Sequence, residues 1–393
     1  MSRPLRIAVA GLGRAFTLML PTFVADARVA LVAGADPLPQ ARAQFTRDFG
    51  GPAFDNVDAL CAFNDVDVVY VATPHQFHAA HVLAALSAGR HVLLEKPMAI
   101  ALDECTAMID AAERACRHLV VGHSHSFNRP VARVRERCER GDFGPVRMIT
   151  ALNYTDFLYR PRRPEELATE AGGGVVFSQG AHQIDVVRLL GGGLVTSVRA
   201  HTGTWDRERP TESAYSALLS FADGVFAHAT YSGNAHYDSD ELVDDIGEMG
   251  QSKSSADYGA ARRRLVAAAM SESALKAARN YGGSLYAPPP SVPAGWNHFG
   301  FVIVSCDRAD LRPTARGVAI YADDEKTFEP LPPPAIPRVE VIDEIHGAVV
   351  DDRPPLHDGR WARATLEACL AILTSAREKR EVPLTHQVAA RRG

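Results

Sequence analysis

The chain has 393 residues and a formal net charge of −5, and 46% of its residues are apolar. This composition is typical of a folded protein of two or three domains, and the acidic balance argues against nucleic acid as a partner. The six cysteines are scattered without a C-x-x-C pair, which favours reduced thiols in the cytoplasm over disulfides or a zinc site. No apolar run reaches the length of a membrane span, so we expect no membrane partner.

Residues 1–124 alternate short apolar runs with helical patterns. The runs are rich in Val, Ile, Leu and Ala and show little polar alternation, which is typical of parallel strands covered on both faces. A helix is expected over 78–88, ended by Gly89. This order predicts an α/β domain with a doubly wound parallel sheet, a Rossmann domain. The expected strands are 5–10, 29–33, 66–72, 91–94 and 118–122.

Residues 125–345 follow a different pattern and predict an α+β domain with an open, mostly antiparallel sheet. Two expected strands, 213–221 and 225–231, flank Asp223-Gly224, a strong signal for a two-residue hairpin. Further strands are expected at 145–155, 194–201, 301–305 and 318–321, with an insertion at 252–293 and a proline-rich linker at 330–337.

The last segment, 346–393, is expected to carry a helix that packs back on the body of the protein. This helix begins near Trp361 and places Leu366, Leu370 and Leu373 on one side.

A glycine turn directly follows the first expected strand and opens a helix. Gly11 permits the tight turn, and Gly13 lets a pyrophosphate approach the helix N-terminus, although Phe16 stands where the third glycine of the fingerprint is usual. Asp36, at the end of the second strand, is suited to bind ribose hydroxyls and to repel a 2′-phosphate, which favours NAD over NADP. The alternative is an ordinary turn with Asp36 as a helix N-cap.

Other polar residues follow two further strands of the same sheet. Thr73 and His75 follow one strand, and Glu95 and Lys96 end the next, so all four should reach the crevice beyond the carboxyl ends of the strands. Lys96 is a candidate for proton transfer, because burial readily shifts the pKa of a lysine. The alternatives are a solvated strand end at Lys96 and a purely structural role for His78. The predicted cofactor-binding residues are Gly11, Gly13, Arg14, Ala15, Asp36, Thr73, His75, Glu95 and Lys96.

A glycine-bounded helix in the second half carries Ser178, His182 and Asp185 at spacing i, i+4, i+7, which predicts that they share one face. His182 is a candidate ligand-facing group, and the alternative is a structural histidine. Upstream, a proline-stiffened loop contains three arginines suited to bind carboxylates, unless they pair with nearby glutamates. The predicted substrate-binding residues are Arg160, Arg162, Arg163, Ser178 and Asp185; no metal site is predicted.

These motifs together resemble the Gfo/Idh/MocA oxidoreductase family over nearly the whole chain. The resemblance implies that Glu95 helps to hold the nicotinamide, that Lys96 and His182 are catalytic, and that the Lys–Pro peptide is often cis. It also implies that the open sheet of the C-terminal domain forms an oligomer interface, so we expect a homodimer or homotetramer. The motifs that carry the resemblance are the glycine turn, Thr73-Pro74, Glu95-Lys96-Pro97, the glycine-rich helix and His182.

One departure from the family pattern bears on the substrate. Many members have an aspartate four residues before the catalytic histidine, where this chain has Ser178. The segments 123–128 and 176–179 and the arginine loop are similar to the branch that oxidises the cis-4,5-dihydrodiol of phthalate. We therefore predict a cytoplasmic, NAD-dependent dehydrogenase that oxidises such a dihydrodiol to a catechol. The alternatives are a sugar or cyclitol dehydrogenase and a non-catalytic, NAD-sensing regulator.

Overall fold

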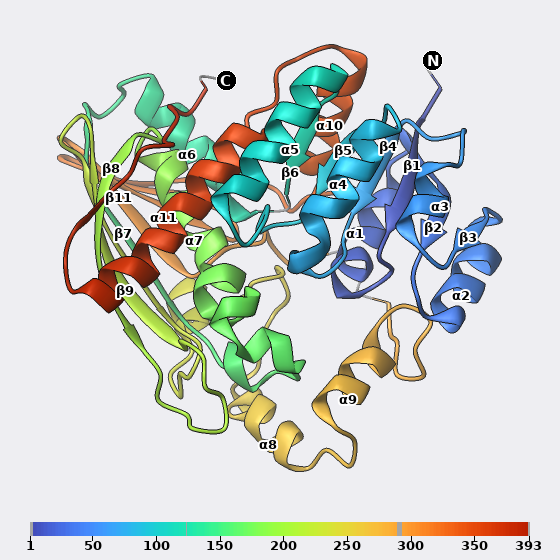
Figure 1. The fold of residues 1–393 in the computed structure, drawn as a ribbon. Helices are drawn as coiled ribbons and strands as arrows, with labels where there is room; N and C mark the ends of the chain where they lie inside the picture. The colour runs from blue at the N-terminus through green and yellow to red at the C-terminus, as the bar shows by residue number, and fades with distance from the viewer. Residues whose placement is uncertain (1–2, 123, 289–292, 392–393) are drawn as a thin grey trace. The chain divides into compact units, whose positions relative to one another are not determined.

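The computed structural model describes residues 3–122, 124–288 and 293–391 (Figure 1). The chain divides into two compact units. One comprises Met1–His123, Met270–Val292 and Ala335–Arg363, and the other comprises Ser124–Ala269, Pro293–Pro334 and Ala364–Gly393. The domain limits expected from the sequence remain a prediction. The insertion expected at 252–293 contributes residues to both units.

The first unit contains a parallel sheet of six strands in the order β3-β2-β1-β4-β5-β6. This order confirms the doubly wound Rossmann sheet, in which ligands bind beyond the carboxyl ends of the strands. The strands are β1 (Leu5–Ala10), β2 (Val29–Ala35), β3 (Ala53–Phe54), β4 (Val68–Val71), β5 (His91–Leu94) and β6 (Leu119–Val121). The helices are α1 (Arg14–Ala25), α2 (Pro39–Phe49), α3 (Val57–Cys61), α4 (His78–Ser87), α5 (Leu102–Ala115), α9 (Glu272–Arg279) and α10 (Val339–Val350).

The core of this sheet consists of the apolar runs recognised in the sequence. All residues of β4 are buried, as are Val92, Leu93 and Leu94 of β5, because helices cover both faces of a doubly wound sheet. Gly89 has a φ of +74° just after α4, in agreement with the expected helix end. The two-residue β3 was not predicted, because so short a strand has no periodicity to detect.

The second unit contains a sheet of nine strands in the order β14-β13-β12-β11-β7-β10-β9-β8-β15. Among the described strands of this second sheet, only β7 and β10 pair in parallel, which confirms a mostly antiparallel sheet. The strands are β7 (Val146–Tyr154), β8 (Val195–Gly203), β9 (Ala214–Phe221), β10 (Phe226–Ser232), β11 (Phe301–Cys306), β12 (Ala309–Thr314), β13 (Gly317–Ala322), β14 (Lys326–Pro330) and β15 (Val382–Pro383).

The helices of the second unit are α6 (Arg129–Glu139), α7 (Ala181–Leu190) and α8 (Ala260–Val266), together with most of α11 (Gly359–Glu378). The strands β12 and β14 were not predicted, because each contains a proline, at residues 313 and 330, and proline argues against a strand. In α11 the buried side runs through Trp361, Ala364, Ala368 and Ile372. Leu370 and Leu373, expected on the apolar side of α11, are only half-buried.

Candidate active site

The glycine turn of the first unit is fixed by its contact with the end of β4. Gly11 has a φ of +94°, and a methyl group built on it would lie 2.8 Å from the carbonyl oxygen of Ala72. The N–H of Gly11 also donates to the carbonyl oxygen of Ala35 at 2.8 Å. The positive φ and the close approach to Ala72 require glycine, so the backbone of the turn lies against β2 and β4 with no side chain between them.

Gly13 occupies the N-cap position of α1, and no side chain of the described residues caps this helix. The first N–H groups of α1 therefore suit an anion, as the pyrophosphate of a dinucleotide requires. Beside it, Arg14 is exposed and Ala15 is half-buried. Phe16 is fully buried against the ring of Tyr281, with the ring centroids 5.2 Å apart, so it occupies a position that the usual third glycine would leave open.

Asp36 ties the glycine turn to the end of β2. Its two carboxylate oxygens accept hydrogen bonds from the N–H groups of Leu12 at 2.9 Å and Leu38 at 2.8 Å. The N-cap position of α2 belongs to Leu38, so Asp36 is not the cap of that helix. Each carboxylate oxygen retains a second lone pair, which is what a ribose hydroxyl requires. The glycine turn, the uncapped helix and Asp36 together fit NAD.

Glu95 is buried at the end of β5 and accepts a hydrogen bond from the hydroxyl of Tyr70 at 2.5 Å. Burial raises the pKa of Glu95, while the Tyr70 hydrogen bond and the charges of Lys96 and Arg338 act in the opposite direction. Lys96 follows with a half-buried side chain, and its peptide bond to Pro97 is cis. A carboxyl group and an ammonium group thus stand side by side at this strand end.

His78, at the start of α4, links the ends of β4 and β5. Its ring nitrogens lie 2.9 Å from the carbonyl oxygen of Thr73 and 3.0 Å from that of Pro97. Burial lowers the pKa of His78 to about 4, so the ring is neutral at working pH. This agrees with the structural alternative for His78, which positions the segment after β5. The hydroxyl of Thr73 contacts Nδ1 of His81 at 2.9 Å, and His75 is half-buried nearby.

In the second unit, His182 of α7 belongs to a cluster with His125 and Glu248. The two imidazole rings meet edge to face, with the ring centroids 4.7 Å apart. Nε2 of His125 lies 3.4 Å from Oε1 of Glu248. One ligand atom from each of the three residues lies within 4.8 Å of the others. Phe299 packs against both histidine rings, so the cluster has one apolar wall.

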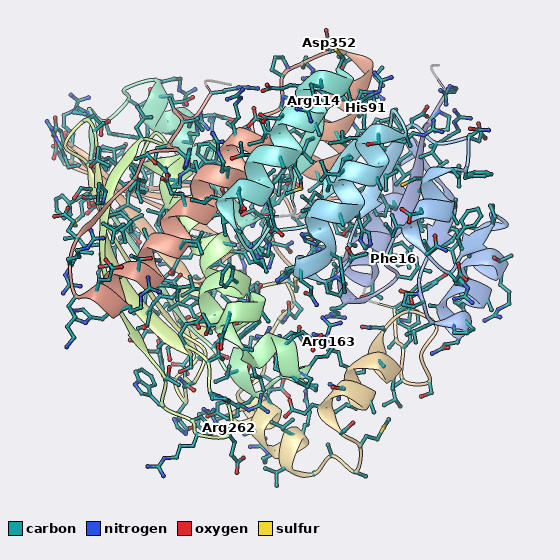
Figure 2. The ribbon with its side chains drawn as sticks, viewed as in Figure 1. Phe16, His91, Arg114, Arg163, Arg262 and Asp352 are labelled. Atoms are coloured by element: carbon teal, nitrogen blue, oxygen red, sulfur yellow. The ribbon has the colours of Figure 1, made fainter. Side chains whose placement is uncertain are left out.

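The arginine loop lies in the same unit and shows a division of roles. Arg160 lies 3.9 Å from Oε2 of Glu248, and 45% of its side chain is exposed. Arg162 stacks on the ring of Phe157 at 3.6 Å and donates to the carbonyl oxygen of that residue. Burial lowers the pKa of Arg162 to about 10, which leaves it charged at neutral pH. Arg163, labelled in Figure 2, pairs with Glu165 at 3.0 Å, and Arg160 also pairs with Asp156 at 3.4 Å, so the ion-pair alternative applies to both of these arginines.

The segment before α7 differs from the regular helix that was expected. Residues Val176–Gly180 form a π-helical turn, so Ser178 does not continue the spacing of α7. Gly174 has a φ of +82° and lies against the carboxylate of Glu212, which accepts a hydrogen bond from Val176. The glycines thus let a buried carboxylate hold the backbone where the helix begins.

Asp185 lies on α7 one turn after His182. Its oxygens accept hydrogen bonds from Thr365 at 2.8 Å and from Ser126. These bonds tie α7 to α11 and to the segment that carries His125. The predicted contact of Asp185 with substrate stays a prediction.

Reasoning from sequence did not single out His125 or Glu248 as site residues. His125 lies in the segment 123–128, which was noted only as a similarity; His123 itself lies outside the described residues. Glu248 stands in a loop without periodicity, so only its tertiary contact with His125 reveals it.

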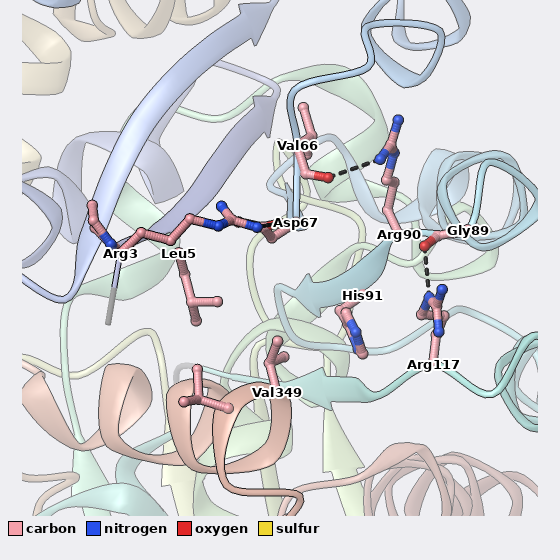
Figure 3. Close-up of a pocket in the computed structure, with 11 residues that line it drawn as sticks. Arg3, Leu5, Val66, Asp67, Gly89, Arg90, His91, Arg117 and Val349 are labelled. Atoms are coloured by element: carbon pink, nitrogen blue, oxygen red, sulfur yellow. Dashed lines mark hydrogen bonds and ion pairs between the residues drawn. The ribbon is translucent and has the colours of Figure 1, made fainter. Parts of the chain in front are cut away.

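A surface pocket in the first unit lies at the opposite end of the Rossmann sheet (Figure 3). Leu5, Asp67 and His91 line it, at or just before the amino ends of β1, β4 and β5. Arg117 and Gly89 also line the pocket, and Nε of Arg117 donates a hydrogen bond to the carbonyl oxygen of Gly89 at 2.6 Å. Because ligands of such sheets bind at the carboxyl ends of the strands, this pocket is separate from the nucleotide site.

The six-stranded sheet, the glycine turn and Asp36 define an NAD-binding oxidoreductase. A family model described as "Oxidoreductase family, NAD-binding Rossmann fold" matches residues 5–123, and the "GFO/IDH/MocA C-terminal domain" model matches residues 131–251. The chain belongs to the GFO/IDH/MocA oxidoreductase family. The predicted family, the enzyme class and NAD as cofactor are therefore confirmed.

Individual relatives support the same assignment. The chain is 48% identical, over 94% of both chains, to the 1-carboxy-3-chloro-3,4-dihydroxycyclohexa-1,5-diene dehydrogenase of Comamonas testosteroni. It is 31% identical to the D-glucoside 3-dehydrogenase of Escherichia coli over 51% of this chain and 58% of the relative. A crystal structure of a dehydrogenase from Bordetella bronchiseptica superposes with a TM-score of 0.91 at 39% identity, covering 97% of this chain and all of that one.

Among the described residues, no helix combines the length and the apolarity that crossing a bilayer requires.

Proposed function

We propose that this oxidoreductase oxidises a carboxylated cis-dihydroxycyclohexadiene, such as the cis-4,5-dihydrodiol of phthalate, to the corresponding catechol. The observation that carries the proposal is the position of Arg160 beside Glu248 and the His125–His182 pair in a single unit. A cation next to hydrogen-bonding rings suits a substrate that is both a carboxylate and a diol. The Comamonas relative, named for a carboxylated dihydroxycyclohexadiene, supports the same substrate class.

Lys96 is the group we assign to proton transfer. One carbinol C–H bond breaks with its electron pair, and NAD⁺, when bound, supplies the acceptor for this hydride. Lys96 takes the proton of the same hydroxyl group, so a C=O bond forms and the charges balance. The ketone then enolises to an aromatic catechol, which makes oxidation the downhill direction. Glu95 holds the strand end that carries Lys96, with Tyr70 as its hydrogen-bond donor.

His182 assists by hydrogen bonding to the reacting hydroxyl group, and His125 and Glu248 orient its ring. Asn128 supports this order, because its amide nitrogen donates to the carbonyl oxygen of Asn297 at 2.8 Å and lies 3.0 Å from Nδ1 of His125. That arrangement assigns the ring proton of His125 to Nε2, which faces Glu248. Arg160 and Arg162 bind the substrate carboxylates, with Arg163 and Ser178 at the edge of the same subsite and Asp185 as a positioning residue.

A sugar or cyclitol dehydrogenase is the second candidate. The specific observation in its favour is Glu248, a carboxylate next to the histidine pair. It takes the place of the aspartate that many family members have at the position of Ser178. The resemblance to the glucoside dehydrogenase points the same way. The arginines favour the carboxylated substrate, because a neutral polyol gives them no anion to bind.

Assembly and location complete the proposal. We place the enzyme in the cytoplasm as a homodimer or homotetramer that associates through the nine-stranded sheet. Leu218 and Phe226 support this interface, because they lie on one face of β9 and β10 and are 47% and 45% exposed. Light scattering after size-exclusion chromatography would return a monomer mass if this interface is wrong.

The experiment that tests the function is a screen of NAD⁺ reduction by the purified protein. The substrates are the cis-4,5-dihydrodiol of phthalate, other aromatic cis-diols, inositols and aldoses. We expect NADH formation with the carboxylated dihydrodiol and competitive inhibition by phthalate. Turnover of inositol or an aldose with no inhibition by phthalate would replace this proposal with the second candidate.

A further inference from the structure

The C-terminal half of the insertion belongs to the Rossmann unit, although it is distant in sequence from the rest of that unit. It consists of α9 and the turn that follows, which we call the α9 arm, residues 270–288 (Figure 1). Leu275, Ala278 and Tyr281 of the arm are buried, with exposed fractions of 8%, 9% and 1%. The arm is therefore packed onto its unit as part of the fold.

The arm contacts the cofactor helix and its neighbour through defined residues. Tyr281 meets Phe16 edge to face, and its hydroxyl donates to Asp48 of α2. Gly282 has a φ of +75°, and a methyl group built on it would lie 2.8 Å from the carbonyl oxygen of Gln40. The departure at Phe16 from the glycine fingerprint thus has a counterpart in the arm, which supplies the aromatic partner for that ring.

This docking brings Asn280 to the glycine turn. A methyl group built on Gly13 would lie 3.8 Å from Nδ2 of Asn280. Among the described residues, apart from the chain neighbours of Gly13 and its own helix, no other atom would lie within 4 Å of this methyl group. The side of Gly13 on which a pyrophosphate must lie is therefore otherwise open, with an amide donor at its border. Asn280 is half-buried, so its side chain is partly shielded from solvent and yet accessible to a ligand.

We propose that Asn280 is a cofactor-binding residue, which donates a hydrogen bond from its amide to a pyrophosphate oxygen of NAD. The α9 arm then serves as a second wall of the nucleotide site, opposite the N-terminus of α1, and Tyr281 holds it in register. A neutral donor suits this place, because the N–H groups of α1 already provide the positive field for the phosphates. A carboxylate at the same position would repel them.

The test measures NADH binding to the full-length protein by calorimetry, so it does not depend on turnover. Asn280→Ala should weaken binding about tenfold, as expected for the loss of a hydrogen bond to a charged group. Asn280→Asp, which keeps the shape and adds a charge, should weaken it more. Ser273→Ala, on the exposed side of α9, is the matched control and should bind like the wild type.

Shorter ligands separate a phosphate contact from a general loosening of the fold. ADP-ribose retains the pyrophosphate, so Asn280→Ala should lower its affinity by the same factor as that of NADH. AMP should bind the wild type and Asn280→Ala with equal affinity. The ligand-free variant should unfold at the wild-type temperature. The inference is overturned if both Asn280 variants bind NADH like the wild type, or if Asn280→Ala loses AMP binding and thermal stability together.

Discussion

The hydroxyl of Tyr70 donates a hydrogen bond to the carboxyl of Glu95 at 2.5 Å, and both side chains are buried. The bond joins β4 to β5 at the carboxyl end of the Rossmann sheet. Glu95 immediately precedes Lys96, so Tyr70 fixes the backbone from which the proposed base projects. A phenol deep in the core thus positions the strand end that carries the proposed catalytic lysine.

Tyr70→Phe removes this bond and leaves the buried carboxyl with one donor fewer. We expect the free energy of unfolding to fall by about 2 kcal/mol, because hydrogen bonds to charged groups contribute more than neutral ones. Tyr215→Phe is the matched control, since the buried Tyr215 donates to the neutral amide oxygen of Gln183 at 2.7 Å. Denaturant titration should show a smaller loss for the control. Equal losses would mean that Glu95 draws no particular support from Tyr70.

His78 predicts a pH dependence of stability. Its pKa in the folded protein is about 4, against an ordinary value of 6.5. Because the folded state favours the neutral ring, the stabilisation is complete above pH ~6.5 and is lost as the pH falls towards ~4, by up to about 3 kcal/mol. As the pH falls over this range, the unfolding temperature of the wild type should therefore drop more steeply than that of His78→Gln. The exposed His201→Gln serves as control and should follow the wild type; parallel curves for all three proteins would refute the role of His78.

Lys96→Met tests the proposed base. The side chain keeps its length and loses its proton-accepting nitrogen, so turnover should fall by a factor of about 10³, within the usual range for general acid–base catalysis. NADH should still bind within about threefold of the wild type, because Asp36 and the glycine turn are unchanged. Steady-state kinetics and calorimetry on one preparation give both numbers. Wild-type turnover in this variant would remove Lys96 from the mechanism.

Arg160→Gln tests the carboxylate subsite. We expect KM for the carboxylated dihydrodiol to rise about tenfold with little change in kcat, because the lost contact holds the substrate equally before and during the reaction. Arg147→Gln, which breaks an exposed ion pair with Asp307 in the same unit, should leave KM unchanged. A KM that rises equally for a diol without carboxylates would point to a loosened loop.

The cluster of His125, His182 and Glu248 has the composition of a metal site, yet we predict catalysis without a metal. Asn128 directs the lone pair of His125 at Nδ1 and its proton at Nε2, toward Glu248. Dialysis against EDTA should therefore leave turnover unchanged, and elemental analysis should find less than one equivalent of bound metal. Loss of activity on chelation, restored by a divalent cation, would contradict this assignment.

Features that depend on a local sequence pattern, such as strand limits and the glycine turn, could be predicted from the sequence. The strands Leu5–Ala10 and His91–Leu94 have the predicted limits, and Gly11 is required for the physical reason that its motif suggested. Ser178 was misplaced, because a π-helical turn precedes α7 and periodicity assumes a regular helix. Glu248 could not be found, because its relation to His125 arises from tertiary contact alone.

The proposed activity depends most directly on the selection of a carboxylate on the substrate ring. The direct measurement compares kcat/KM for NAD⁺ reduction with the cis-dihydrodiol of phthalate and with that of benzene, which has the same diol and no carboxylate. We predict a preference of at least about tenfold for the carboxylated substrate, in line with a charged hydrogen-bonded contact. Equal values, or faster turnover of the benzene dihydrodiol, would contradict the account.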